Sequence, residues 1–187
     1  GVGHPVPNQS VEQRKGSPSA NGTWSAAQLA SGAGGVIVGR EPGPDWRMRV
    51  GEAGSYLWSP TQDLLALLGN RCRGFDLFML EPENETLTNL TASYDEIVQF
   101  FVWEPGGSRI TAPVIAFGAT RGSIVSFDAL TGQREVIISV EGDWMFSPLV
   151  WDPSGTKLLF EASRGVPKLC GDDVEYRDTY LDPVPNF

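Results

Sequence analysis

The stretch FFVWEPGGSRI, residues 100–110, changes abruptly from aromatic residues to a polar turn and then returns to apolar residues. The same pattern occurs earlier as SYLWSPTQDLLALL (55–68) and later as SPLVWDPSGTKLLF (147–160). In each copy, Trp-x-Pro precedes the polar turn and a strand-like run follows it. A pattern that recurs at a nearly fixed spacing indicates a repeated supersecondary unit.

The Trp-x-Pro tripeptides are the most regular part of the repeat, and we call them the markers. Their tryptophans are 45 and 48 residues apart, close to the length of a four-stranded β-propeller blade. A tryptophan at a strand end can fill the space between neighbouring sheets and bury about 200 Å². A proline ends the strand at a turn. We therefore interpret the markers as structural residues: Trp58, Pro60, Trp103, Pro105, Trp151 and Pro153.

The residues around the markers predict an all-β protein of small, stacked units. Short apolar runs alternate with Gly, Pro, Asn and Asp, which is typical of strands and tight turns. In the three clear units, the second strand after the marker is expected at 75–80, 123–130 and 178–181. A degenerate unit is expected before them, with Trp24-Ser25, 35–39 and 45–50. Each unit alone leaves a sheet face unburied, so the units must stack.

The repeat resembles the WD40-like repeats of TolB-type β-propellers. The resemblance is strongest at 55–91, good at 100–138 and 147–162, and weak at 24–50. It implies propeller blades, but propellers of this type usually have six or more. Three outcomes stay open: a compact four-bladed ring, an open arc completed by another chain, or a fragment of a longer protein.

Residues 1–23 differ in composition from the rest of the chain. They are rich in Pro, Gly, Ser, Asn and Gln and cannot bury enough apolar area to offset their ordering entropy. We therefore expect a flexible N-terminal arm at 1–23, ordered only against a partner, and a propeller-like domain at 24–187.

The net charge of the 187-residue chain is −9 and its pI is near 4.6. Phosphate would repel such a chain, which argues against nucleic acid or an anionic membrane surface as partner. No apolar run approaches the roughly 20 residues that span a bilayer. The chain opens with Gly and shows no signal peptide, so we expect an exported chain whose signal has been removed.

Few residues are suited to catalysis, and we expect no enzymatic activity. The single histidine, His4, lies in the predicted arm, whereas triad mechanisms need a fixed imidazole. No cofactor is expected. An acidic cluster near the C-terminus could hold calcium through carboxylate oxygens or be a solvated loop; its members are Asp172, Asp173, Glu175 and Asp178.

Two further sets of residues, the cysteines and the N-x-[ST] sequons, indicate the cellular compartment. Cys72 and Cys170 each follow the strand after a marker, in corresponding loops, so they form either a disulfide or two free thiols. A disulfide would indicate an oxidising compartment. Four asparagines begin N-x-[ST] sequons and are either glycosylation sites of an exported protein or turn residues: Asn8, Asn21, Asn84 and Asn89.

These features predict a non-catalytic, extracytoplasmic scaffold subunit. Its propeller loops and arm would dock onto a larger protein assembly, as the TolB resemblance suggests for the cell envelope. One alternative is a glycan-binding propeller that uses exposed aromatics such as Trp144 or Tyr94. Another is the propeller part of a hydrolase or peptidase that lacks its catalytic domain.

Overall fold

The computed structural model describes residues 16–29, 34–43, 45–71, 74–92, 96–116, 121–142, 144–164 and 180–183. This part of the chain is all-β apart from one 3-10 turn, η1 (Pro82–Asn84), as the sequence predicts. None of its helices is long and apolar enough to cross a membrane.

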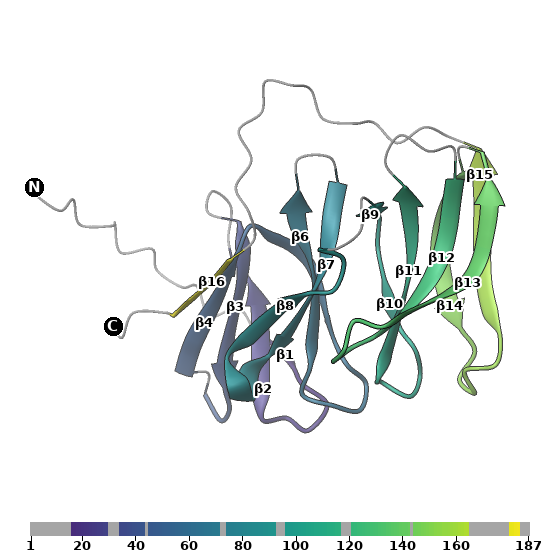
Figure 1. Cartoon of the computed structure of the whole chain (residues 1–187). Coiled ribbons are helices and arrows are strands. Elements are labelled where there is room, and N and C mark those ends of the chain that lie inside the picture. The colour runs from purple at the N-terminus through teal and green to yellow at the C-terminus, as the bar shows by residue number, and fades with distance from the viewer. Residues whose placement is uncertain are drawn as a thin grey trace, which may run out of the picture.

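The first two repeat units are antiparallel meanders that follow one another along the chain (Figure 1). Unit 1 contains β1 (Ser17–Pro18), β2 (Trp24–Gln28), β3 (Gly35–Arg40) and β4 (Asp45–Gly51). Unit 2 contains β5 (Ala53–Trp58), β6 (Leu65–Arg71), β7 (Gly74–Glu81) and β8 (Thr86–Asn89).

Unit 3 repeats this arrangement, and unit 4 has two strands among the described residues. The first strand of unit 3 is interrupted, and its two parts both pair with β11. Unit 3 contains β9 (Glu96–Val98), β10 (Val102–Trp103), β11 (Arg109–Ala116), β12 (Arg121–Asp128) and β13 (Arg134–Glu141). Unit 4 contains β14 (Trp144–Trp151) and β15 (Leu158–Arg164), which pair only with each other.

The backbone fixes the register of the repeat. The residue after each marker tryptophan donates its N–H to the carbonyl five residues later, at 2.8–3.0 Å; these donors are Ser59, Glu104 and Asp152. In unit 1 the same bond joins Ser19 to Trp24 at 2.8 Å. Trp24, which we expected within a degenerate first unit, therefore lies on the second strand of unit 1. Pro18 stands where the other units have tryptophan.

The described part of unit 1 begins at residue 16, before the expected domain boundary at residue 24. Strand β1 pairs with β2, with Ser17 opposite Ala26 and Pro18 opposite Ser25. The turn at 19–23 therefore belongs to the sheet, although its composition suggested an arm. Residues 1–15 lie outside the described residues.

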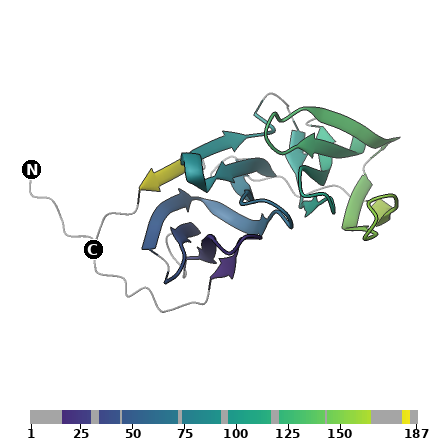
Figure 2. The ribbon, with the colours of Figure 1, turned by 90° about the horizontal axis from the view of Figure 1, so that it is seen from below.

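In unit 4 we expected the second strand after the marker at 178–181. Strand β16 (Tyr180–Pro183) lies there but does not belong to unit 4. It pairs with β4, with Leu181 opposite Val50, and so adds a strand to the outer edge of unit 1. Units 1 and 4 lie at opposite ends of the molecule, and β16 lies at the unit 1 end (Figures 1 and 2). The described units therefore form an open row and not a closed ring.

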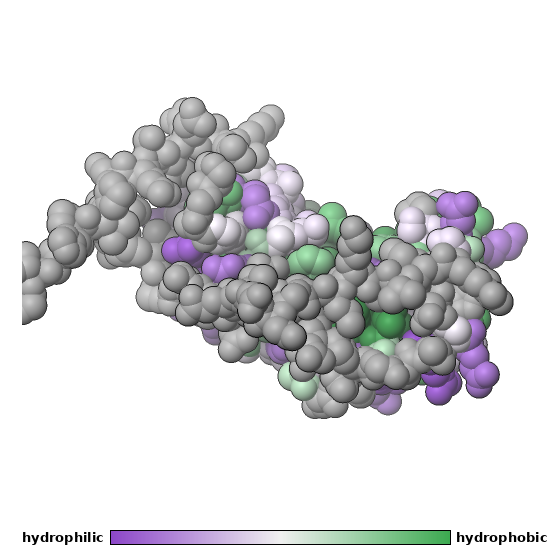
Figure 3. Space-filling model, turned by 90° about the horizontal axis from the view of Figure 1, so that it is seen from above, coloured by the Kyte–Doolittle hydropathy of each residue, from purple (hydrophilic) through white to green (hydrophobic). Residues whose placement is uncertain are grey.

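Three hydrophobic clusters fill the spaces between successive units. Leu65 and Leu67 on β6 face unit 1, whereas Ala66 and Leu68 face unit 3, because side chains alternate along a strand. The third cluster, between units 3 and 4, contains Phe146. Seen from above, hydrophilic residues show toward both ends of the described part, and apolar residues show between them (Figure 3). Each inner unit is thus buried on both faces.

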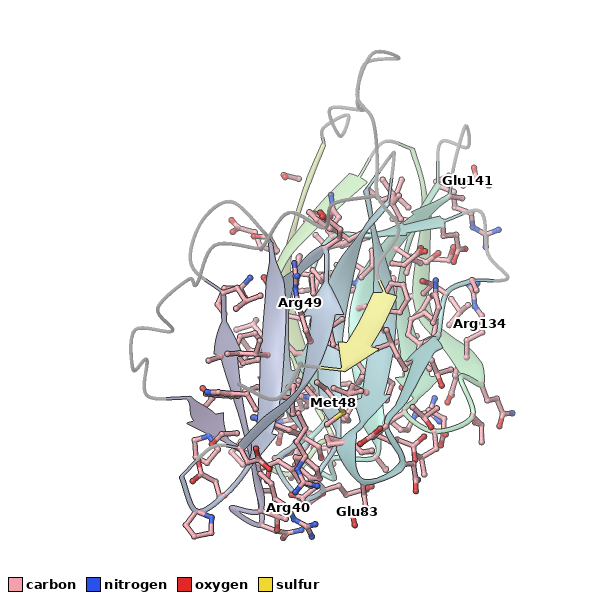
Figure 4. The ribbon with its side chains drawn as sticks, turned by 90° about the vertical axis from the view of Figure 1, so that its left-hand side faces the viewer. Arg40, Met48, Arg49, Glu83, Arg134 and Glu141 are labelled. Atoms are coloured by element: carbon pink, nitrogen blue, oxygen red, sulfur yellow. The ribbon has the colours of Figure 1, made fainter. Side chains whose placement is uncertain are left out.

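Surface charges add little to this arrangement. Arg40 of unit 1 and Glu83 of unit 2 lie near one another (Figure 4), with Nη2 and Oε2 separated by 3.7 Å. Both side chains are exposed, and exposed ion pairs contribute at most about 1 kcal/mol. Apolar burial between units is therefore the main source of stability.

Candidate interaction surface

Each marker tryptophan joins its own unit to the preceding one. The indole N–H of Trp58 donates to Ser17 O at 2.7 Å, and that of Trp103 donates to Leu57 O at 3.0 Å. Both acceptors immediately precede the marker position of their unit. Trp151 differs, because it donates to the hydroxyl of Thr111 at 3.1 Å.

The turns after the markers also contact one another in sequence order. The Ser59 hydroxyl donates to Gly107 O at 2.8 Å, and that of Thr61 donates to Gly106 O at 3.0 Å. A methyl group on Gly155 would lie 3.6 Å from Pro105 Cδ. The marker tryptophan of a unit thus binds the preceding unit, and the turn after the marker contacts the corresponding turn of the neighbouring unit.

A polar cluster supports the contact between units 3 and 4. A carboxylate oxygen of Glu104 accepts hydrogen bonds from the hydroxyls of Thr111, at 2.9 Å, and Ser126. The guanidinium Nε of Arg109 donates to the Ser126 hydroxyl at 2.7 Å. Because Thr111 also accepts the Trp151 indole, this cluster positions the acceptor for unit 4. No sequence pattern indicates that these distant residues meet.

Unit 4 buries one face and exposes the other. Leu158 and Phe160 pack on the cluster shared with unit 3, so Leu159 points away from it. Val150 lies opposite Leu159, and Ser147 lies opposite Glu161. We call the exposed set the trailing face of unit 4: Ser147, Val150, Leu159 and Glu161.

Equivalent positions in the other units show how unusual this face is. Ala66, Thr111 and Leu159 each lie eight residues after a marker tryptophan. Ala66 and Thr111 are both 0% exposed, whereas Leu159 is 73% exposed. The next unit covers Ala66 and Thr111, and no described residue does the same for Leu159. An exposed leucine is common, but a repeat position that is otherwise fully buried marks an uncovered interface.

A hollow lies against residues of units 1, 2 and 3. It has a volume of about 540 Å³ and is lined by Gln28, Gly54, Ser55, Tyr56, Leu57, Leu68, Phe100 and Phe101. Its two largest polar side chains already bind backbone. The Tyr56 hydroxyl donates to Ala26 O, and the Gln28 amide donates to Ala53 O, both at 3.1 Å. This groove therefore offers a ligand few free polar groups.

Several predicted residues lie outside the described part of the chain, so the structure says nothing about the disulfide or the calcium cluster. They are Asn8, Cys72, Cys170, Asp172, Asp173, Glu175 and Asp178. Tyr94 is also outside, as is the side chain of Trp144. Among the described residues, no group of three or more His, Cys, Asp and Glu is arranged to hold a metal ion.

The three remaining sequons differ in their surroundings. Asn21 and Asn84 are exposed. The side-chain amide nitrogen of Asn89, which would carry a glycan, donates to the buried Asp76 at 2.9 Å. The amide oxygen of Asn89 accepts the N–H of Thr91 at 2.9 Å. Asn89 is therefore occupied as a turn residue.

Two carboxylates of the described chain likewise organise turns. The pKa of Asp128 is lowered below its usual 3.8 because the backbone N–H and hydroxyl of Thr131 donate to it. The pKa of Asp152 is lowered because it accepts hydrogen bonds from the hydroxyl of Ser154 and the N–H of Lys157. Hydrogen bonds to the ionised form keep both groups charged at neutral pH.

Comparison with known proteins bears on the fold. No family model and no curated protein matches the chain. A solved oligogalacturonate lyase in complex with manganese is 17% identical, with a TM-score of 0.51 over 74% of this chain and 44% of the lyase. The fold is that of a β-propeller. This chain spans less than half of the lyase, and so corresponds to part of a propeller of that size.

A second solved structure is a TolB-like protein from Agrobacterium tumefaciens. It is 12% identical, with a TM-score of 0.49 over 67% of this chain and 48% of the TolB-like chain. Within the propeller, the four units described above are blades, and the trailing face of unit 4 is the side on which another blade would stack.

Proposed function

We propose that this chain is a non-catalytic, extracytoplasmic protein-binding subunit with TolB-type repeats, and that it docks onto a larger assembly through the trailing face of unit 4. The observation that carries the proposal is the exposure of Leu159 at a position buried in units 2 and 3. Obligate interfaces resemble a hydrophobic core that has been divided between two partners. The trailing face exposes Leu159 at a repeat position that belongs to the buried interface in units 2 and 3. The exposed sequons Asn21 and Asn84 are compatible with an exported chain.

The proposed docking surface differs from the one expected from sequence. The loops and the arm were expected to contact partners, but residues 1–15 lie outside the described residues. The trailing face combines two exposed aliphatic side chains, Val150 and Leu159, with polar Ser147 and Glu161 beside them. An apolar centre with a polar rim is the usual anatomy of a protein–protein interface.

Photo-crosslinking tests the proposal at single-residue resolution. A photoreactive amino acid at position 159 is expected to give a discrete crosslinked product in the cells that make the protein. The same group at Leu130, another exposed leucine (57%) in a turn of unit 3, serves as the matched control. Equal crosslinking from both positions, or none from position 159, would show that the trailing face has no partner.

A further inference from the structure

We infer that the groove beside β5 binds a short extended peptide, which pairs with the free edge of β5 and places one apolar side chain against Phe100 and Phe101. The eight residues that line this groove belong to units 1, 2 and 3, whereas the trailing face belongs to unit 4. The inference therefore goes beyond the proposed docking function and does not depend on it.

The edge of β5 offers main-chain hydrogen bonds. Strand β5 is the last strand of its sheet and pairs only with β6 among the described strands. Ser59 N–H donates to Leu64 O at 2.8 Å, and hydrogen-bonded pairs alternate with non-hydrogen-bonded pairs along an antiparallel ladder. By the observed register, Leu57 therefore bonds to β6, and the backbone N–H and carbonyl of Tyr56 point away from β6. No described residue bonds to these two groups of Tyr56, so they can pair with a ligand.

A bulge in β5 limits this pairing to a short segment. The register shifts between Ala53 and Tyr56, and the carbonyl of Ala53 already accepts the Gln28 amide at 3.1 Å. Pairing with a ligand therefore starts at Tyr56 and does not continue past the bulge. The outer edge of unit 1 shows that so short a pairing forms in this protein, because the four residues of β16 add to β4 as an antiparallel strand.

Aliphatic and aromatic side chains form the wall of the groove on the unit 3 side. Leu57 lies opposite Ala66, whose side chain faces unit 3, and side chains of directly opposed residues share a face. The side chain of Leu57 is 48% exposed. Phe100 and Phe101 also line the groove, because they occupy the interruption between β9 and β10. A ligand residue opposite Leu57 would turn its side chain toward the same wall, so we expect that residue to be apolar.

The charge of the groove favours a neutral ligand. None of the eight lining residues is charged, whereas the net charge of the chain is −9, which would repel an acidic peptide. The side chains of Gln28 and Tyr56 already bind backbone, so they leave little for a polar side chain to bind. Main-chain pairing combined with pockets for alternate side chains is a recurrent mode of peptide recognition. Here it selects an extended backbone with one apolar side chain.

A peptide titration tests the inference. The probe is acetyl-Ser-Thr-Thr-Leu-Thr-Thr-Ser-amide, which is uncharged, favours an extended backbone and carries one apolar side chain. Because contacts of this size are weak, binding is followed at equilibrium by NMR of the isotope-labelled full-length chain. We expect saturable shifts of the amide signals of Tyr56 and Leu57. Replacing the central Leu of the peptide by Asp should weaken binding at least about tenfold, since it places a charge at an apolar wall.

Methylation of single peptide amides distinguishes strand pairing from apolar contact alone. Antiparallel addition, as for β16, places the central Leu opposite Leu57 and the following Thr opposite Tyr56. Methylating the N–H of that Thr should weaken binding at least about fivefold, because the carbonyl of Tyr56 then lacks a donor. Methylating the N–H of the central Leu, which points away from β5, is the matched control and should have little effect.

Variants of the full-length chain locate the site. Leu57→Glu, at a half-exposed position, is expected to weaken binding of the Leu peptide at least about tenfold, because it places a charge at the apolar wall. Leu130→Glu and Leu159→Glu should bind the peptide like the wild type, since neither residue lines the groove. Leu159→Glu also separates the two sites: it should lose docking through the trailing face and keep the peptide.

Four results would overturn the inference: no shifts at Tyr56 and Leu57, equal binding of the Leu and Asp peptides, equal effects of the two N-methyl groups, or unchanged binding to Leu57→Glu. If Leu57→Glu does not fold, the two N-methylated peptides titrated into the wild-type chain decide the question.

Discussion

Replacing Trp103 by alanine is expected to lower the free energy of unfolding by about 3–5 kcal/mol, the usual cost of truncating a packed tryptophan. Trp103 packs against the cluster between units 2 and 3, and its indole N–H donates to Leu57 O at 3.0 Å. The change therefore removes both the apolar and the polar link to unit 2. Urea denaturation followed by circular dichroism measures the loss.

Trp103→Phe is the matched control. It keeps most of the ring packing and removes the hydrogen bond, so the expected loss is about 1 kcal/mol, the typical net value of one hydrogen bond. If Trp103→Ala were no more destabilising than Trp103→Phe, the tryptophan would contribute little through packing. The marker would then be a turn residue rather than a link between blades.

Gly107→Ala is expected to destabilise the protein by about 2–4 kcal/mol, because two costs add. Gly107 has φ of +71°, a conformation that disfavours any side chain. A Cβ there would also lie 2.1 Å from Thr61 Oγ1 and 2.6 Å from Ser59 Oγ. Those hydroxyls belong to the turn of unit 2, so the collision separates neighbouring turns, and overpacking of this kind costs about 1–3 kcal/mol.

The repeat supplies the controls for Gly107, since Gly22 and Gly155 occupy the same turn position with φ of +68° and +70°. A Cβ on Gly22 meets nothing within 4 Å, and one on Gly155 only touches Pro105 at 3.6 Å. Their alanine variants should therefore lose about 1 kcal/mol each, from backbone conformation alone. Equal losses at the three glycines, in thermal or urea unfolding, would contradict the stacking of the turns.

The sequence predicted the all-β class and the stacking of repeat units because the marker is local. Trp, Pro and the following turn lie within a few residues, and three of the four units keep them. Unit 1 lacks this local marker, so the sequence placed it only as a degenerate unit. Pro18 replaces the tryptophan, Trp24 lies nearby on another strand, and only the bond from Ser19 to Trp24 reveals the register.

Contacts between residues that are distant in the sequence could not be predicted from local sequence patterns. The segment around Tyr180 has the composition of a strand, but nothing in it specifies β4 as its partner. The network of Glu104, Thr111 and Trp151 joins residues from two units and has no sequence signature. Leu159 likewise looks like any apolar residue of a strand, and its exposure becomes informative only beside the buried Ala66 and Thr111.

The native mass of the particle isolated from its own cells tests the docking function most directly. For the wild-type protein and for Leu130→Glu we expect a particle larger than a single polypeptide, and for Leu159→Glu we expect the single polypeptide alone. A wild-type particle that contains one polypeptide only, or a larger particle that persists in Leu159→Glu, would contradict the role of the trailing face.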